Sequence, residues 1–194
     1  NALYINEYLD KGLITNNEAE SLLLSTHFIN PLFVIGMVGN VIFKSTKIGF
    51  IILLALWISN LIKAYITRPR VYKNIDKKNI SCNESIINSL FISIKQAIYA
   101  LLTIMGIIIL FNMLTILIKE VLHLNNTLSV IINGILEMTG GITRVLELNI
   151  NTLLKMLITY IMLNFGGLSI HMQAFSMLEN KKIRYLKYLI FRVF

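Results

Sequence analysis

Glu137, a carboxylate inside an apolar segment, is the first residue of this sequence whose type and position could do chemistry. It stands in the run GILEMTGG, within a stretch apolar enough to lie at membrane depth. A charge at that depth is costly unless it is paired, hydrated or neutralised, so such residues mark ion or substrate pathways. We expect Glu137 to contact a coupling ion or the substrate. The alternatives are a structural ion pair with Arg144, about two helical turns further along the chain, and a place at the membrane interface.

Two adjacent glycines interrupt a second apolar segment, in the run NFGGLSIHMQ over residues 164–173. Gly166 and Gly167 weaken a helix because glycine has the most backbone freedom to lose. The polar side chains that follow them are Ser169, His171 and Gln173. One interpretation is a locally unwound helix that lines a polar site. The other is a closely packed helix whose polar groups bond to neighbouring helices.

A third motif places polar residues before a proline, in the run THFINPLFVIG over residues 26–36. His27 and Asn30 precede Pro31, which removes a backbone donor and frees a carbonyl at the start of an apolar run. The alternative is an ordinary proline in the first turn of a helix. Interrupted apolar segments in two parts of one chain indicate a transporter site. The pattern therefore favours transport of a small solute.

The composition predicts an all-α integral membrane protein. Of the 194 residues, 56% are hydrophobic and only 14% are charged, which is more apolar surface than one soluble core normally buries. The net charge of +8 comes from basic residues beside apolar segments. That arrangement is typical of cytoplasmic membrane flanks, and a nucleic-acid partner is not expected.

Metal, redox and enzyme chemistry are not expected. The sequence has a single cysteine, Cys82, and no cluster of cysteine and histidine with metal-ligand spacing. It also lacks the GxSxG, HExxH and P-loop patterns of common hydrolases and nucleotide-binding proteins. We therefore predict no catalytic residue, no metal and no cofactor.

One amphipathic segment and five apolar segments must position these residues. Residues 3–25 are amphipathic and broken at Gly12, with a capping box at Thr15 and Glu18 that opens a second short helix. The apolar segments that follow are 28–43, which contains Pro31 and two glycines, then 48–66, 97–118, 127–147 and 153–177. We expect Lys63, near the end of the second apolar segment, to extend its amine to the membrane surface.

Charge orients the apolar segments in the membrane. The loop over residues 67–85 and the tail over residues 181–192 are both basic, and basic loops face the cytoplasm. Both can do so only if residues 127–147 enter and leave on one face as a re-entrant hairpin. Irregular backbone at membrane depth is tolerated where protein or water covers it, so a hairpin also indicates a cavity.

The start of the sequence suggests a fragment. It opens at Asn1 with no initiator methionine and no signal-peptide pattern. We expect residues 1–194 to be part of a longer protein.

Four motifs resemble the sporulation membrane proteins of the gate, or nucleoside-recognition, domain group. They are KGLI with EAE (11–14 and 18–20), NPLFVIG (30–36), LEMT (136–139) and FGGLSIH with Gln173 (165–171). The resemblance extends from about residue 4 to residue 192. It implies that the chain is the C-terminal portion of a gate-domain protein, folded like a concentrative nucleoside transporter with re-entrant hairpins and broken helices.

The same resemblance implies transport of dipicolinic acid across the outer forespore membrane of a sporulating bacterium. The residues that it places against the solute are Asn30, Thr139, Gly166, Gly167, Ser169, His171 and Gln173, with Glu137 and His27 in a polar network. Since dipicolinate is a dianion, Glu137 would repel it, so Glu137 is expected to bind a coupling cation or to orient donors. The alternatives are a nucleoside-type transporter, a spore maturation-type protein and a structural sporulation protein without transport activity.

Overall fold

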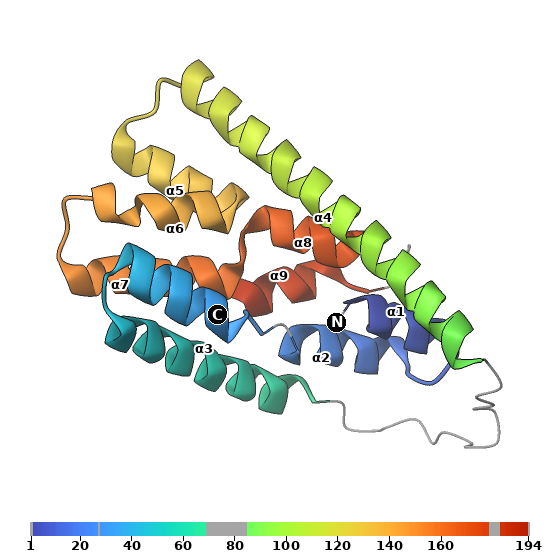
Figure 1. Ribbon diagram of the computed structural model, residues 1–194. Coiled ribbons are helices and arrows are strands. Elements are labelled where there is room, and N and C mark those ends of the chain that lie inside the picture. The colour runs from blue at the N-terminus through green and yellow to red at the C-terminus, as the bar shows by residue number, and fades with distance from the viewer. Residues whose placement is uncertain (1, 27, 69–84, 179–182, 194) are drawn as a thin grey trace.

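The computed structural model describes residues 2–26, 28–68, 85–178 and 183–193, and all regular structure in these ranges is helical (Figure 1). The helices in chain order are α1 (Ala2–Asp10), α2 (Asn16–Ser25), η1 (Phe33–Ile42), α3 (Thr46–Thr67), α4 (Ile86–Val121), α5 (Asn126–Leu136), α6 (Met138–Arg144), η3 (Val145–Glu147), α7 (Thr152–Phe165), α8 (Gly167–Ser176) and α9 (Tyr185–Val193). This all-α architecture agrees with the predicted fold class.

The break between α1 and α2 lies where the sequence indicates it. Gly12 adopts a positive φ of 64°, a conformation that glycine reaches without steric cost. The hydroxyl of Thr15 accepts a hydrogen bond from the amide of Glu18, and the Glu18 carboxylate accepts one from the amide of Thr15 at 2.7 Å. This is the predicted capping box, and it fixes where α2 begins.

The helix η1 and the start of α3 form a tight helical pair. The helix η1 is wound as a π-helix, in which the Phe43 amide donates to the carbonyl of Val38, five residues earlier. A Cβ placed on Gly39 would lie 2.9 Å from the Cα of Gly49, so the two backbones touch. The wide helix and this contact account for the irregular first segment that the sequence predicts.

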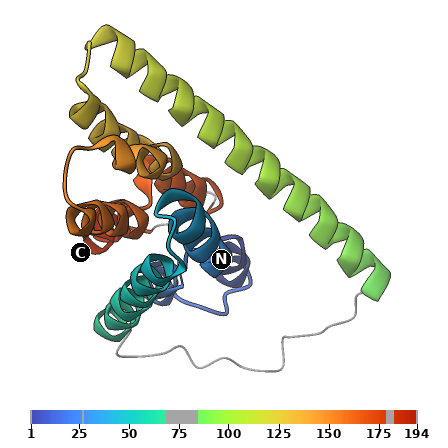
Figure 2. The same cartoon turned by 60° about the vertical axis from the view of Figure 1, so that its left-hand side comes forward.

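In the described part of the chain, three segments are long and apolar enough to cross a membrane: α3, α4, and the broken segment formed by α7 and α8. The helix α4 has 36 residues, which gives a length of about 54 Å against a bilayer core of about 30 Å. Figure 2 shows α4 running as a straight rod beside the other helices. Few of its residues are buried, so most of its apolar surface is left for lipid or another partner.

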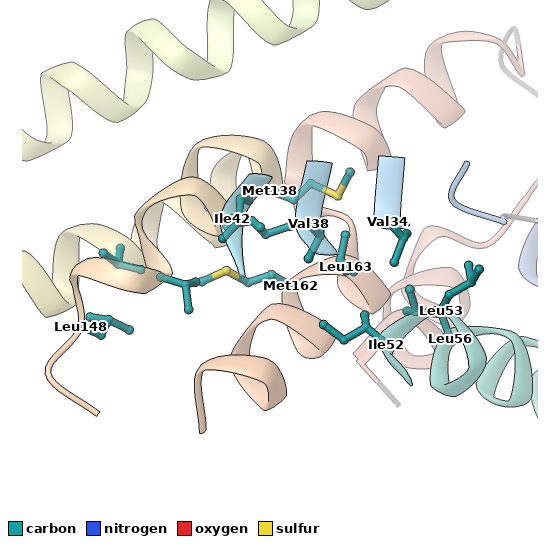
Figure 3. Packing of buried hydrophobic residues seen from close by; sticks show 13 residues of the cluster. Val34, Val38, Ile42, Ile52, Leu53, Leu56, Met138, Leu148, Met162 and Leu163 are labelled. Atoms are coloured by element: carbon teal, nitrogen blue, oxygen red, sulfur yellow. The ribbon is translucent and has the colours of Figure 1, made fainter. Parts of the chain in front are cut away.

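Two hydrophobic clusters hold the other helices together. The larger one packs η1 and α3 against α6, α7 and the tip between α5 and α6, and Figure 3 shows its members, among them Val38, Leu53, Met138 and Leu163. The smaller one joins α1 and α2 to α8 and α9 and includes Leu24 and Tyr188. The first and last helices of the chain therefore share a core.

Candidate functional site

Glu137 forms the tip of a helical hairpin made by α5 and α6. Its backbone is extended, with φ −139° and ψ 112°, and its amide donates to the carbonyl of Asn133 at 2.7 Å, which ends α5. Its carboxylate accepts hydrogen bonds from the amides of Thr139 at 3.1 Å and Gly140 at 2.7 Å, which start α6. The Thr139 hydroxyl donates to the same carboxylate at 2.5 Å. Glu137 thus ends one helix and caps the next.

Small residues let the two arms of this hairpin lie against each other. A Cβ placed on Gly141 would collide with the backbone of Gly134, which shows that α5 and α6 are in direct backbone contact. The two glycines stand at about equal distances along the chain from Glu137. The arms are therefore antiparallel, as Figure 1 shows.

The carboxylate of Glu137 is 4% exposed, and among the described residues it has no basic partner. The alternative of an ion pair with Arg144 is therefore absent from this structure. Its carboxylate accepts three hydrogen bonds, two from Thr139 and one from Gly140, and an anion at a helix N-terminus is favourably placed for such bonds.

The second break, between α7 and α8, lies at the predicted glycines. Gly166 has φ 87° and Gly167 has φ 72°, both in the left-handed region that favours glycine. A Cβ placed on Gly167 would lie 2.9 Å from the amide nitrogen of Met138 and 3.3 Å from the carbonyl oxygen of Leu136. The two interruptions therefore touch each other, Gly167 lying directly on the hairpin tip.

His171 points to the other side of this junction. Its Nε2 lies 2.9 Å from the carbonyl oxygen of Phe165, which must accept the bond, so Nε2 carries the proton. Its Nδ1 lies 3.3 Å from the hydroxyl of Tyr185, and its ring packs at 5.0 Å against the ring of Tyr188. His171 thus satisfies a carbonyl at the end of α7 and joins α8 to α9.

The structure separates the remaining predicted site residues. Ser169 is fully buried in α8, and its hydroxyl has no partner among the described residues; Gln173 is half-buried one turn further on. Asn30 is exposed, and its side-chain oxygen accepts a bond from the amide of Leu32 at 2.9 Å, which is a local capping role. His27 and residues 69–84 of the basic loop lie outside the described residues.

Sequence reasoning missed a group of oxygen atoms around Gly140. A Cβ placed there would lie 3.5 Å from Oε2 of Glu137, 3.6 Å from Oδ1 of Asn133 and 3.9 Å from Oδ1 of Asn112 on α4. Asn133 precedes Glu137 by four residues, a helical spacing that could have revealed it. Oxygen atoms of this kind are ligands for hard cations such as Ca²⁺ and Mg²⁺.

Sequence reasoning also missed the burial of two cations. Lys63 does not extend to the surface: it is 4% exposed, and its Nζ donates to Oδ1 of Asn164 at 2.7 Å. The burial of Arg192, in the basic tail, was also not foreseen: it is 1% exposed on α9, over the ring of Tyr188. The reason is that α9 folds back against α7, which closes this side of the molecule. Burial lowers the pKa of the Arg192 guanidinium from its ordinary value.

Long apolar helices, apolar side chains exposed along them and two interrupted helices in contact define a helical integral membrane protein. The chain is similar to the sporulation integral membrane protein YlbJ of Bacillus subtilis (strain 168), with 26% identity over 224 residues that cover 93% of this chain and 53% of that protein. The chain thus spans about half the length of the curated relative it matches. No family model and no solved structure matches it. The predicted resemblance and the membrane localisation are confirmed.

Proposed function

We propose that this chain forms part of a membrane transporter, and that a small solute passes at the junction of the two broken helices. The observation that carries the proposal is the contact of Gly167 with the backbone on either side of Glu137. Interrupted helices that meet around polar groups are how transporters build sites within the bilayer. A junction of this kind gives solute and ions polar groups where lipid offers none.

The hairpin of α5 and α6 is proposed to be re-entrant, as in concentrative nucleoside transporters. The helix α5 has 11 residues and is about 16 Å long, roughly half of a bilayer core of about 30 Å. A hairpin with its open end at one membrane surface would therefore carry Glu137 to about the middle of the bilayer. There the buried carboxylate, with Asn133 and Asn112, is proposed to bind a coupling cation.

Dipicolinate is the proposed solute, because the sequence resembles sporulation membrane proteins of the gate-domain group and the similar protein bears a sporulation name. Ser169 follows Gly167 by two residues, and its buried hydroxyl has no hydrogen-bond partner among the described residues. It supports the proposal that α8 offers a donor to the solute. Thr139, Gly166, Gly167, His171, Gln173, Asn30 and His27 stay predicted members of the site.

The test is solute flux in lipid vesicles that contain the purified natural protein, with Glu137→Gln as the variant. Glutamine keeps one acceptor oxygen for the α6 cap, so the expected loss of stability is only about 1 kcal/mol. We expect normal membrane insertion and at least a ten-fold loss of dipicolinate uptake, because the anionic ligand of the cation is gone. Glu147→Gln, which removes an exposed carboxylate nearby, should transport normally.

Normal uptake by Glu137→Gln would contradict the role given to Glu137. Absence of uptake by the unaltered protein under every cation gradient would favour a structural sporulation protein.

A further inference from the structure

Among the residues that the structure describes, two buried cations lack an anionic partner. Lys63 and Arg192 are 4% and 1% exposed, yet within the described residues neither makes an ion pair with a carboxylate. Glu20, by contrast, is also buried, and it pairs with both Arg184 and Lys187. An uncompensated buried charge strongly destabilises a fold, so its presence requires a reason other than stability.

Both cations lie near Asn164, at the end of α7. The Nζ of Lys63 donates to the side-chain oxygen of Asn164, which also lines a small pocket together with Arg192 and Trp57. The Nε and Nη2 atoms of Arg192 are buried and have no hydrogen-bond partner in the described part of the chain. Arg192 is also close enough for its charge to repel that of Lys63. Lys63 therefore has a neutral acceptor, whereas two nitrogen atoms of Arg192 have none among the described residues.

An open groove reaches Lys63 from the surface of the molecule. It has a volume of about 730 Å³, within the range of small-molecule sites, and it runs between α3, α7 and α9. Lys63 lies in its wall, beside Ser59, whose hydroxyl is 3.5 Å from the same Asn164 oxygen. The groove thus leads from the surface to Lys63, while Arg192 and Asn164 line the small pocket behind it.

We propose that Lys63, Asn164 and Arg192 form a binding site for an oxyanion, either the carboxylate of a solute or the phosphate of a lipid. A guanidinium presents parallel N–H donors that match two oxygens of one such group, and an ammonium adds a point charge. The proposal rests on the proposed function in one respect: a solute anion bound here would lie beside the transport junction. The Nη2 atom of Arg192 is 3.5 Å from the Cβ position of Gly166, and the next residue, Gly167, touches the Glu137 backbone.

The site supplies what the residues around Glu137 lack for an anionic solute. Glu137 and its amide neighbours present oxygen atoms to a cation, whereas Lys63 and Arg192 present positive charge to an anion. The Gly166–Gly167 turn lies between the two groups. A single shift of this turn would therefore act on both ligands.

Binding of an anion to the purified natural protein in detergent tests this site without any flux measurement. The probes are dipicolinate and inorganic phosphate, with dissociation constants from equilibrium dialysis and anion-induced shifts of the unfolding temperature. Lys63→Met and Arg192→Met should each weaken binding by roughly ten-fold or more, the loss of one charge-assisted hydrogen bond. Lys63→Arg should bind more tightly than Lys63→Met. Lys95→Met, which removes an exposed charge on α4, should bind normally.

The unfolding temperature of each variant without anion is the second measurement, and it distinguishes weak binding from poor folding. Because Arg192 is buried without a partner, Arg192→Met should unfold at the same temperature as the unaltered protein or higher. A lower unfolding temperature combined with unchanged anion binding would show that a carboxylate elsewhere pairs with Arg192. That result would overturn the proposal.

Nanodiscs of phosphatidylglycerol and of phosphatidylcholine separate the two sources of oxyanion. A stabilisation that requires phosphatidylglycerol, is lost in both Met variants and is not produced by dipicolinate would assign the site to a lipid phosphate. If the unaltered protein transports dipicolinate and the Met variants bind it equally well, the site fails and the transport function stands. If binding depends on Lys63 and Arg192 but no flux occurs, the site stands and the transport function fails.

Discussion

Three buried charges differ in the hydrogen-bond partners that surround them, and each arrangement indicates a different role. Glu20 accepts hydrogen bonds from the Arg184 side chain at 3.0 Å and from Nζ of Lys187 at 2.9 Å, so it is a fully compensated structural anion. Glu137 receives backbone and hydroxyl donors only. Arg192 has two nitrogens without any described partner. Stability explains the first charge, and for the other two we propose ligands.

The cluster at Glu20 should make the contact between α2 and α9 sensitive to acid. Burial alone would raise the pKa of Glu20, but hydrogen bonds from Arg184 and Lys187 outweigh it and lower the pKa from 4.5 to about 2. A lowered folded-state pKa contributes stability that is present above pH 4.5 and is lost as the pH falls toward 2. We expect the unfolding free energy to fall by about 2 kcal/mol over that window. This is less than the full pKa shift corresponds to, because Arg184 is exposed and solvent screens its charge.

Thermal unfolding in detergent between pH 2 and pH 6 measures this contribution. Glu20→Gln should unfold at a lower temperature than the unaltered protein at pH 6 and at nearly the same temperature at pH 2. An equal difference at both ends of the pH range would show that the ion cluster is not the cause.

At the residue scale, the sequence revealed what depends on local context and missed what depends on distant partners. Glu137 could be singled out because an acidic residue in an apolar run is unusual by itself. The burial of Lys63 could not be predicted, because its acceptor, Asn164, is 101 residues further along the chain. The burial of Arg192 was missed for the same reason: nothing near it in the sequence shows that α9 folds back.

At the scale of elements, the sequence predicted the breaks but not their contact. The capping box of α2, the approximate limits of α3 and the break at Gly166 follow from short-range signals, and the structure has all of them. The contact of Gly167 with Met138 joins two segments whose relation no local pattern encodes. This contact makes the broken segments one unit.

Gly167→Ala tests that contact. The substitution places a Cβ 2.9 Å from the Met138 amide in a residue with φ 72°, so both close approach and backbone strain oppose it. We expect a loss of about 1–3 kcal/mol in unfolding free energy and a marked fall in dipicolinate uptake. Gly106→Ala is the matched control, because a Cβ there meets nothing within 4 Å; it should transport normally and gain up to about 1 kcal/mol.

If Gly167→Ala proved as stable and as active as the unaltered protein, α8 would not be in close contact with the hairpin tip.

Gln173→Leu separates packing from polarity at the same junction, since leucine keeps the bulk and removes the amide.

At the scale of the whole molecule, the arrangement of the ends supports the predicted orientation. Ile66, in the last turns of α3, and Ile190, in α9, line the same groove. The start of the basic loop after α3 and the basic helix α9 therefore lie at the same end of the molecule. Three spans and one re-entrant hairpin would put both flanks in the cytoplasm, as basic segments prefer.

Labelling with a membrane-impermeant thiol reagent tests the orientation. Cys82 is the single cysteine of the sequence, and Lys182→Cys in a Cys82→Ser background provides the second position. Both positions lie outside the described residues, so the expectation rests on the sequence and on the neighbouring helices. We expect both cysteines to react from the cytoplasmic side only. Labelling from opposite sides would show that the α5–α6 hairpin spans the membrane.

The ion cluster of Glu20 also constrains the order in which the protein can be assembled. Its partners, Arg184 and Lys187, follow it by 164 and 167 residues, and all candidate spans lie between them. Chains are synthesised from the N-terminus, so α2 leaves the ribosome long before its partners exist. During that interval its buried face is uncovered, and each span must enter the bilayer without it. The α2–α9 contact can therefore form only after the candidate spans between the two helices have been synthesised, and a chaperone or a quality-control protease could distinguish molecules with this contact from molecules without it.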